Sequence, residues 1–347
     1  MNFSKNKSRI FFFLTALSAV AAFIAGWPIA WAPVAHAAGK GLDVEVPYEI
    51  AALKAPGLTA PYYLQENEGK IVVSDQAGGV FSVTFGGKVT EIAGKAKIRN
   101  PAGLAIGPSG FGSYAGQIFV LASSDDKAPC EVERIDKSGA VSTFAKLPDA
   151  GAPASGCRDL EFGAAGGPFA GKLYAATAGN TSIYAIDSSG KATVLGTYNK
   201  PVQFDLTSIR FAPASDSKAA NQMLVGMRAT MAGASKVGRI GIVSADGKMK
   251  DDVYLVGFVR PTGFAWSPSS FGSYGDELFI ADTGKLVTES AERDGVIYRV
   301  EKGLARPFAS GLMDPTDLKF IGKKIVICDP AEKGKGQGAI VIITSLL

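Results

Sequence analysis

The segment Asn100-Pro-Ala-Gly-Leu-Ala-Ile-Gly-Pro-Ser-Gly-Phe-Gly-Ser-Tyr-Ala-Gly-Gln-Ile-Phe-Val120 recurs as Arg260-Pro-Thr-Gly-Phe-Ala-Trp-Ser-Pro-Ser-Ser-Phe-Gly-Ser-Tyr-Gly-Asp-Glu-Leu-Phe-Ile280. The two copies align over their whole length without a gap. Weaker copies begin at Ala60, Gly156, Asp205 and Asp314. The six copies start about 40 to 56 residues apart, which is the repeat length of β-propeller blades. The repeat therefore predicts six blades.

Each copy holds short apolar runs separated by turns rich in Gly, Pro, Ser and Asp. In the third copy, a first strand is followed by runs at Lys172–Ala175 and Ser182–Asp187, and a fourth run follows the turn Ser188-Ser-Gly190. Residues 38–347 show no helical periodicity of useful length. We therefore predict an all-β fold, a six-bladed β-propeller with four-stranded antiparallel blades.

The ends of the chain indicate how the ring is completed. The last copy supplies strands near Asp317–Phe320, Lys324–Cys328 and Ala339–Ile343, and it lacks a fourth strand. The segment Tyr48–Lys54, which precedes the first copy, resembles the fourth strand of other copies. We expect this N-terminal strand to join the C-terminal blade and pair an edge that is otherwise exposed.

Residues 1–37 have the features of a secretory signal peptide. Three basic residues precede an apolar run from Ile10 to Ile24, and Ala35-His36-Ala37 forms an A-x-A cleavage site. The alternative is an uncleaved membrane anchor, which two prolines and the shortness of the apolar run disfavour. We predict a single propeller domain, residues 38–347, that is periplasmic or extracellular and has no stable membrane insertion after cleavage.

The charge and the histidine content exclude several classes of function. Removal of residues 1–37, which hold three basic and no acidic side chains, leaves 33 basic and 32 acidic residues. A nearly neutral chain without a basic run gives no reason to expect a nucleic-acid partner. The only histidine, His36, lies in the predicted signal peptide. The remaining chain therefore has no Ser-His-Asp or Cys-His catalytic mechanism and no histidine-ligated metal.

The P-x-G-L motif, followed by a strand that ends in Asp, resembles the six-bladed propellers of the NHL, SMP-30 (gluconolactonase-like) and TolB-like group. It is present as Pro261-Thr-Gly-Phe with Leu278-Phe-Ile-Ala-Asp282. In SMP-30-like lactonases, side chains at the x position help to hold a divalent cation. The matching positions here are Ala102, Thr262 and Thr316, so the resemblance carries over no metal ligand.

The blade pattern gathers polar residues at one mouth of the central channel, because the loop that enters the first strand and the loop after the second strand emerge on the same face. These positions are Tyr62, Asn100, Arg158, Asp159, Asp205, Arg260, Asp314, Thr316, Asp317, Asp75, Asp125, Asn180, Arg228, Asp282 and Asp329. A single Asp at such a position commonly caps backbone N–H groups. The set as a whole predicts a binding pocket, since a channel mouth is a preferred ligand site.

The sequence supports three alternative functions at this mouth. The first is hydrolysis of an ester or lactone, with Asp159, Asp205, Arg158 and Arg260 as catalytic residues and Tyr62, Asn100, Arg228, Asp282 and Asp329 as ligand-binding residues. A Ca²⁺ cofactor is assigned to Asp314 and Asp317, because hard cations bind oxygen ligands. The second is non-catalytic binding of a small anionic or sugar-like ligand, or of a periplasmic protein. The third is quinoprotein-type sugar oxidation, which ranks last because the base that those soluble enzymes use is a histidine.

Three cysteines remain after residue 37. Cys130 follows the second strand of the second blade, and Cys157 enters the first strand of the third blade, so both lie on the channel face of neighbouring blades. We predict a Cys130–Cys157 disulfide, as expected in an oxidising compartment. Cys328 is then an unpaired, buried cysteine in the sixth blade.

Overall fold

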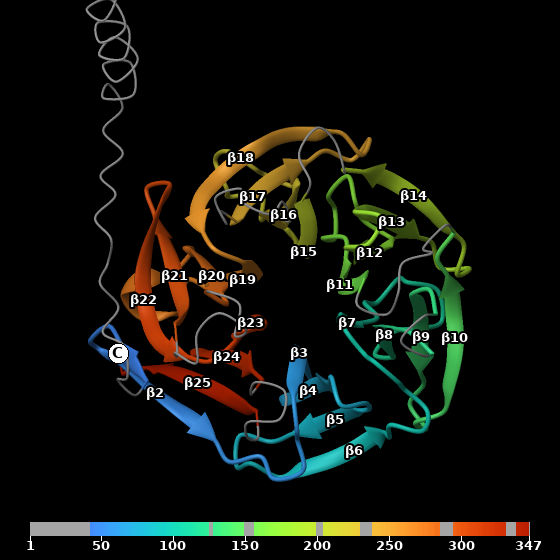
Figure 1. Cartoon of the computed structure of the whole chain (residues 1–347), viewed down its shortest axis with the longest axis horizontal. Coiled ribbons are helices and arrows are strands. Elements are labelled where there is room, and N and C mark those ends of the chain that lie inside the picture. The colour runs from blue at the N-terminus through green and yellow to red at the C-terminus, as the bar shows by residue number, and fades with distance from the viewer. Residues whose placement is uncertain are drawn as a thin grey trace, which may run out of the picture. The chain divides into compact units, whose positions relative to one another are not determined.

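The computed structural model describes residues 42–124, 128–148, 156–198, 204–229, 238–284, 294–330 and 338–346. They all belong to the compact unit 38–347, and the predicted signal peptide lies outside the described residues. Six antiparallel sheets are arranged around a ring, which confirms the six-bladed β-propeller (Figure 1). Within the described ranges, no helix is long and apolar enough to cross a membrane.

Five blades follow one order, in which four consecutive strands pair antiparallel. They are β3 (Pro61–Asn67), β4 (Lys70–Asp75), β5 (Val80–Val83) and β6 (Val89–Ala93); β7 (Leu104–Ile106), β8 (Ile118–Ala122), β9 (Glu131–Ile135) and β10 (Val141–Lys146); β11 (Cys157–Phe162), β12 (Leu173–Thr177), β13 (Ser182–Ile186) and β14 (Ala192–Thr197); β15 (Phe204–Phe211), β16 (Met223–Ala229), β17 (Gly238–Val243) and β18 (Met249–Phe258); and β19 (Pro261–Trp266), β20 (Leu278–Asp282), β21 (Gly295–Glu301) and β22 (Leu304–Leu312). A short 3-10 turn, η2 (Gly272–Tyr274), precedes β20.

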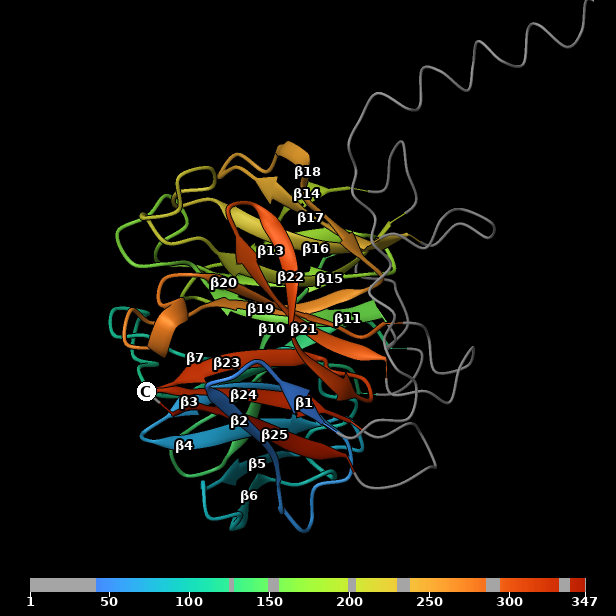
Figure 2. The ribbon, with the colours of Figure 1, turned by 90° about the vertical axis from the view of Figure 1, so that its left-hand side faces the viewer.

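The sixth blade combines β23 (Asp317–Ile321), β24 (Lys324–Asp329) and β25 (Ala339–Ser345) with β2 (Tyr48–Leu53). Strand β2 pairs with β25 along its whole length, from Tyr48 opposite Ser345 to Leu53 opposite Ile340, and the two lie side by side in Figure 2. One difference from the prediction concerns the fifth blade. The short strand β1 (Asp43–Val44) pairs with β22, so this sheet has five strands.

The apolar core lies between the blades. Each of six buried clusters joins two neighbouring sheets; one contains Leu64 and Ile71 from the first blade with Val326 and Ile340 from the sixth. The second strands β8, β12 and β20 are buried at every residue because sheets cover both of their faces. Burial on both faces explains why these strands read as continuous apolar runs.

The repeated Phe-Gly-Ser-Tyr loops pack neighbouring blades together. The ring of Phe111, in the second blade, lies 4.8 Å from the ring of Phe162 in the third. The ring of Phe271, in the fifth blade, lies 4.9 Å from the ring of Phe320 in the sixth. Both Phe111 and Phe271 are buried. The two loops therefore have the structural role that their repetition predicts.

The six first strands, β3, β7, β11, β15, β19 and β23, face the centre of the ring, and each contacts the next (Figure 1). The glycine of the P-x-G motif permits this close approach. A Cβ on Gly103 would lie 2.6 Å from the Cα of Asp159, and a Cβ on Gly263 would lie 2.7 Å from the Cα of Asp317. The motif glycines are thus required by the narrow centre of the propeller.

Candidate functional site

A pocket of about 180 Å³ lies where the first strands begin, and residues from five of the six blades line it. The lining residues are Tyr62, Tyr63, Gln76, Arg158, Thr207, Arg228, Arg260, Thr262, Asp314 and Thr316. Six of them belong to the set that the sequence places at the channel mouth. The structure thus brings Tyr62, Arg158, Arg228, Arg260, Asp314 and Thr316 together.

Two of the three pocket arginines are matched by carboxylates. Arg228 donates from Nε and Nη2 to Oδ2 of Asp205, at 3.1 and 2.7 Å. Arg260 donates from Nη2 to Oδ1 of Asp314, at 2.7 Å. Burial raises the pKa of Asp314 above its usual range, although Arg260 opposes the shift. The pocket therefore contains one carboxyl group that is easier to protonate than an ordinary Asp.

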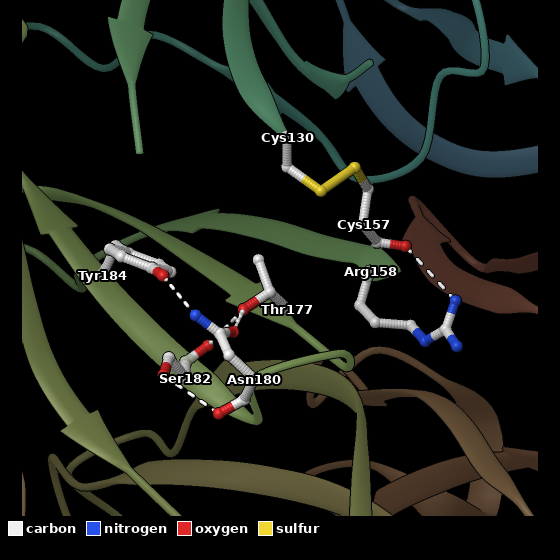
Figure 3. Close-up of a disulfide and its surroundings, with 7 residues drawn as sticks. All are labelled: Cys130, Cys157, Arg158, Thr177, Asn180, Ser182 and Tyr184. Carbon is white, nitrogen blue, oxygen red and sulfur yellow. Dashed lines mark hydrogen bonds between the residues drawn. A yellow bond between two sulfur atoms is a disulfide. The ribbon is translucent and has the colours of Figure 1, made fainter. Parts of the chain in front are cut away.

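The third pocket arginine, Arg158, has no carboxylate partner among the described residues. Its Nη1 donates only to the carbonyl oxygen of Cys157, at 3.3 Å. Cys157 is joined to Cys130 by a disulfide with a Cα–Cα distance of 5.7 Å, which links the start of β11 to the loop before β9. Figure 3 shows the Arg158 side chain extending from the strand beside this disulfide. The remaining cysteine, Cys328, is free and buried.

The x positions of the P-x-G motif hold the blades together in half of the ring. The hydroxyl of Thr207 donates to the carbonyl oxygen of Pro261 in the next blade. Thr262 likewise donates to Pro315 at 2.6 Å, and Thr316 donates to Tyr62 at 2.6 Å. These hydroxyls line the pocket, but their protons are used in bonds between blades. Residues at the positions of family metal ligands therefore have a structural role here.

Three aspartates that end second strands cap backbone N–H groups. Asp75 accepts from Thr59, Ala60 and Ala77; Asp282 accepts from Val259, Arg260 and Gly284; and Asp329 accepts from Met313 and Asp314. All three are nearly fully buried. The predicted ligand-binding residues Asp282 and Asp329 thus hold the loops that enter the first strands, and neither lines the pocket.

The asparagines predicted at the mouth also lie outside the pocket lining. Asn100 is half-buried before Pro101 and has a left-handed backbone conformation with φ of 41°. Asn180 donates to the hydroxyl of Tyr184 at 2.6 Å and accepts from Thr177, as Figure 3 shows. Asp125, the remaining position of the predicted mouth, lies outside the described residues.

Asp159 and Asp317 lie inside the ring rather than at its mouth. They replace the glycine of the motif in the third and sixth blades, and their side chains are 1% and 0% exposed. Each carboxylate accepts from a backbone N–H of the next blade: Asp159 from Ile209 at 2.9 Å, and Asp317 from Leu64 at 3.1 Å. Neither residue lines the pocket. Their positions therefore do not support the predicted catalytic role of Asp159 or the predicted metal-binding role of Asp317.

Arg210 joins these two buried aspartates. Its Nη1 lies 2.5 Å from Oδ2 of Asp159, and its Nη2 lies 2.6 Å from Oδ1 of Asp317. Beside it, Lys319 pairs with Glu161 at 2.9 Å. Burial opposes ionisation of Glu161, but Lys319 and Arg210 together hold its pKa below the usual range. Sequence reasoning missed Arg210, Glu161 and Lys319.

A signal for this buried network is present in the sequence. Glu161 and Lys319 each lie two residues after the aspartate of their strand, and Arg210 lies two residues after Ser208, which occupies the same motif position. In a strand, residues at this spacing share one face. The charged face of three first strands therefore points into the channel.

The residues present do not fit the predicted Ca²⁺ site. Asp314 is paired with Arg260, and Asp317 with Arg210, so both assigned ligands already neutralise a guanidinium group. Across the described ranges, no group of three or more His, Cys, Asp or Glu side chains is arranged to hold a metal ion. A Ca²⁺ site normally takes six or more oxygen ligands with several carboxylates among them.

Comparisons with known proteins support the fold. The chain matches no protein-family profile and no curated protein sequence. Among solved structures it is similar to a gluconolactonase from Xanthomonas campestris, with TM-score 0.59, 10% identity, and coverage of 89% of this chain and 99% of that chain. It is also similar to the soluble aldose sugar dehydrogenase from Escherichia coli (TM-score 0.58, 11% identity, 86% and 99% covered) and to virginiamycin B lyase from Staphylococcus aureus (TM-score 0.54, 14% identity, 86% and 99% covered). At these identities the likeness establishes the propeller architecture.

Proposed function

We propose that this propeller is a periplasmic or extracellular protein that binds a small polar ligand in the pocket at its channel mouth. The observation that carries the proposal is the convergence of three arginines, two tyrosines and one aspartate from five blades on one concave site. Concave sites with a few convergent polar groups are the usual ligand sites of proteins. The Cys130–Cys157 disulfide supports an oxidising compartment.

A variant that fills the pocket tests this proposal. Gln76 lines the pocket and its side chain is exposed, so Gln76→Trp places an indole in the mouth without removing a bond within the protein core. Thr90→Trp, at an exposed position of β6, is the matched control. We expect calorimetry with neutral sugars, sugar acids, lactones and phosphate esters to detect binding to the wild type and to the control. If Gln76→Trp binds the same compounds equally well, the ligand site is elsewhere.

A second candidate function is hydrolysis of an ester or lactone, and the raised pKa of Asp314 favours it. A carboxyl group with a raised pKa is a better general base, and Asp314 lines the pocket together with Arg158. In this reaction, the Asp314 carboxylate takes a proton from water as the water oxygen bonds to the acyl carbon. Arg158 stabilises the oxyanion, and the carbon–oxygen bond to the leaving alcohol then breaks as that oxygen takes the proton back from Asp314, which regenerates the carboxylate.

An ester and lactone panel separates the two functions. If the chain is a hydrolase, turnover by the wild type falls by about two to four orders of magnitude in Asp314→Asn. Asp216→Asn is a control, because Asp216 lies outside the channel-mouth pocket. Ligand binding without turnover of any compound supports the binding function alone.

A further inference from the structure

We propose that the ligand of the mouth pocket is a small organic acid whose oxyanion is held by Arg158. This inference rests on the proposed function and specifies its ligand class. It starts from the charges in the pocket. Arg228 and Arg260 are matched by Asp205 and Asp314, whereas Arg158 faces no carboxylate among the described residues. Among the described residues, the three pocket arginines are therefore paired with only two carboxylates.

The guanidinium of Arg158 is available for a ligand. Arg158 is half-buried, and its side chain makes one hydrogen bond to the described residues, a 3.3 Å contact with the carbonyl of Cys157. Most of its five N–H donors have no partner in the part of the chain that the structure describes. A planar guanidinium with paired free donors matches a carboxylate or a phosphate in bidentate geometry.

Arg260 adds a second guanidinium group to the same pocket. Its Nη2 is paired with Asp314, but its Nε is buried and has no hydrogen-bond partner among the described residues. Arg158 and Arg260 line the same pocket, so one ligand can reach both.

The pocket is poorly suited to a neutral sugar as its main ligand. The hydroxyls of Thr207, Thr262 and Thr316 donate to backbone carbonyls of neighbouring blades. Tyr63, at the floor, donates to the carbonyl of Thr207 at 3.1 Å. The donors left for a ligand are the guanidinium groups, the Gln76 amide and the Tyr62 hydroxyl, and only the guanidinium groups carry a charge, which favours an anion over a polyol.

The disulfide places the start of the Arg158 strand before any ligand arrives. Cys157 is covalently bound to the neighbouring blade, so the backbone next to Arg158 is fixed on one side by the disulfide and on the other by Asp159 in the buried network. An anchor that is already in position loses less entropy on binding. We expect Arg158 to act as the anchor and Arg260 as a second contact.

The test uses Arg158→Gln, which removes the charge and keeps a polar side chain. Arg306→Gln is the matched control, because Arg306 is an exposed arginine paired with Glu301 outside the pocket. The probes are gluconate, succinate and glucose 6-phosphate, with glucose and glycerol as neutral counterparts, each titrated calorimetrically against the full secreted chain. Comparing gluconate and succinate with glucose 6-phosphate shows whether the bound oxyanion belongs to a carboxylate or to a phosphate.

We expect at least one acid to bind wild type and Arg306→Gln, with affinity at least tenfold weaker in Arg158→Gln and falling as salt increases. If glucose or glycerol binds as well as the acids, and Arg158→Gln has no effect, the ligand class is wrong while the pocket function survives. Binding of an acid that Gln76→Trp does not impair contradicts both proposals. Absence of binding by every acid at millimolar concentration also overturns the inference.

Discussion

Arg210 provides the sharpest test of how the channel is held together, because it is paired with two carboxylates and its side chain is 6% exposed. We predict that Arg210→Met strongly destabilises the propeller. The substitution keeps much of the apolar stem but leaves Asp159 and Asp317 without their cation. Glu161 retains Lys319 at 2.9 Å, so its charge remains matched.

The size of the loss in unfolding free energy follows from what the two aspartates still contact in Arg210→Met. Asp159 keeps donors from Leu160, Ser208 and Ile209, whereas Asp317 keeps one donor among the described residues, the backbone N–H of Leu64, together with the nearby charge of Lys319. The loss therefore falls mainly on Asp317. Removing one partner of a buried ion pair costs about 3 to 5 kcal/mol. For a domain of this length, about 4 kcal/mol lowers the melting temperature by roughly 6 °C.

Urea unfolding measures the loss through the fluorescence of Trp266, the single tryptophan of residues 38–347. Trp266 ends β19, which contacts the strands of both Arg210 and Asp317. Arg306→Met is the control. Its exposed pair with Glu301 is expected to contribute less than about 1 kcal/mol to the free energy of unfolding.

The pH dependence has a defined sign. Burial raises the pKa of Asp317 even in the wild type, although Arg210 lowers it. Without Arg210 the pKa rises further, so the folded variant takes up a proton at a pH where the unfolded chain does not. The deficit in unfolding free energy is therefore largest at neutral pH and shrinks as the pH falls through the raised pKa of Asp317.

A second variant separates charge from packing. Asp317→Asn keeps an acceptor for the Leu64 N–H and removes the buried charge, so the double variant Arg210→Met/Asp317→Asn should recover more than half of the loss. A single variant as stable as the wild type would refute the role of the network. If neither a lower pH nor Asp317→Asn reduces the loss of unfolding free energy in Arg210→Met, the loss is due to packing rather than to charge.

Three further predictions address the blades and the pocket. Thr262→Val should cost about 1 to 3 kcal/mol in urea unfolding, because the Pro315 carbonyl loses its 2.6 Å donor and keeps only the 3.3 Å bond from Thr283, and Thr262→Ser should restore most of the loss. Removal of the 27-residue Cys130–Cys157 link by double Ala substitution should cost on the order of 3 kcal/mol; thiol titration of unfolded, unreduced wild type should count one thiol. A sulfonate analogue of the bound acid should bind more tightly as the pH falls through the raised pKa of Asp314, since protonation removes a negative charge beside Arg260, and Asp314→Asn should abolish this trend.

The architecture could be predicted because it is repeated. Six copies of one pattern gave the number of blades, the order of their strands and the packing role of Phe111 and Phe271. The β1 strand was missed, because two residues, Asp43 and Val44, carry no periodicity that a sequence pattern can detect. The pairing of β2 with β25 was accessible, since the last copy has only three strands of its own.

The site was harder to predict, because the sequence indicates which face a residue lies near and not what it contacts. Asp282 and Asp314 are both acidic residues near the same mouth, yet Asp282 accepts backbone N–H groups while Asp314 lines the pocket. A shift of one position along β11 separates Arg158 in the pocket from Asp159 in the buried network. Adjacent residues of a strand point to opposite faces, and β11 also has an irregularity in its register between Cys157 and Leu160, which no sequence pattern locates.

The departures from the repeat indicate where function lies. At the x position of the motif, the fourth, fifth and sixth blades carry Thr207, Thr262 and Thr316, and each threonine donates to the following blade. The third blade instead carries Arg158 at this position, directly after Cys157. Its disulfide joins it to the preceding, second blade, whereas its bonds to the following, fourth blade come from Asp159, which accepts from Ser208 and Ile209. The x side chain, Arg158, is therefore left for the pocket. A position that three blades use for a hydrogen bond to the next blade thus carries a cation in the third blade, and this difference favours Arg158 as the ligand anchor.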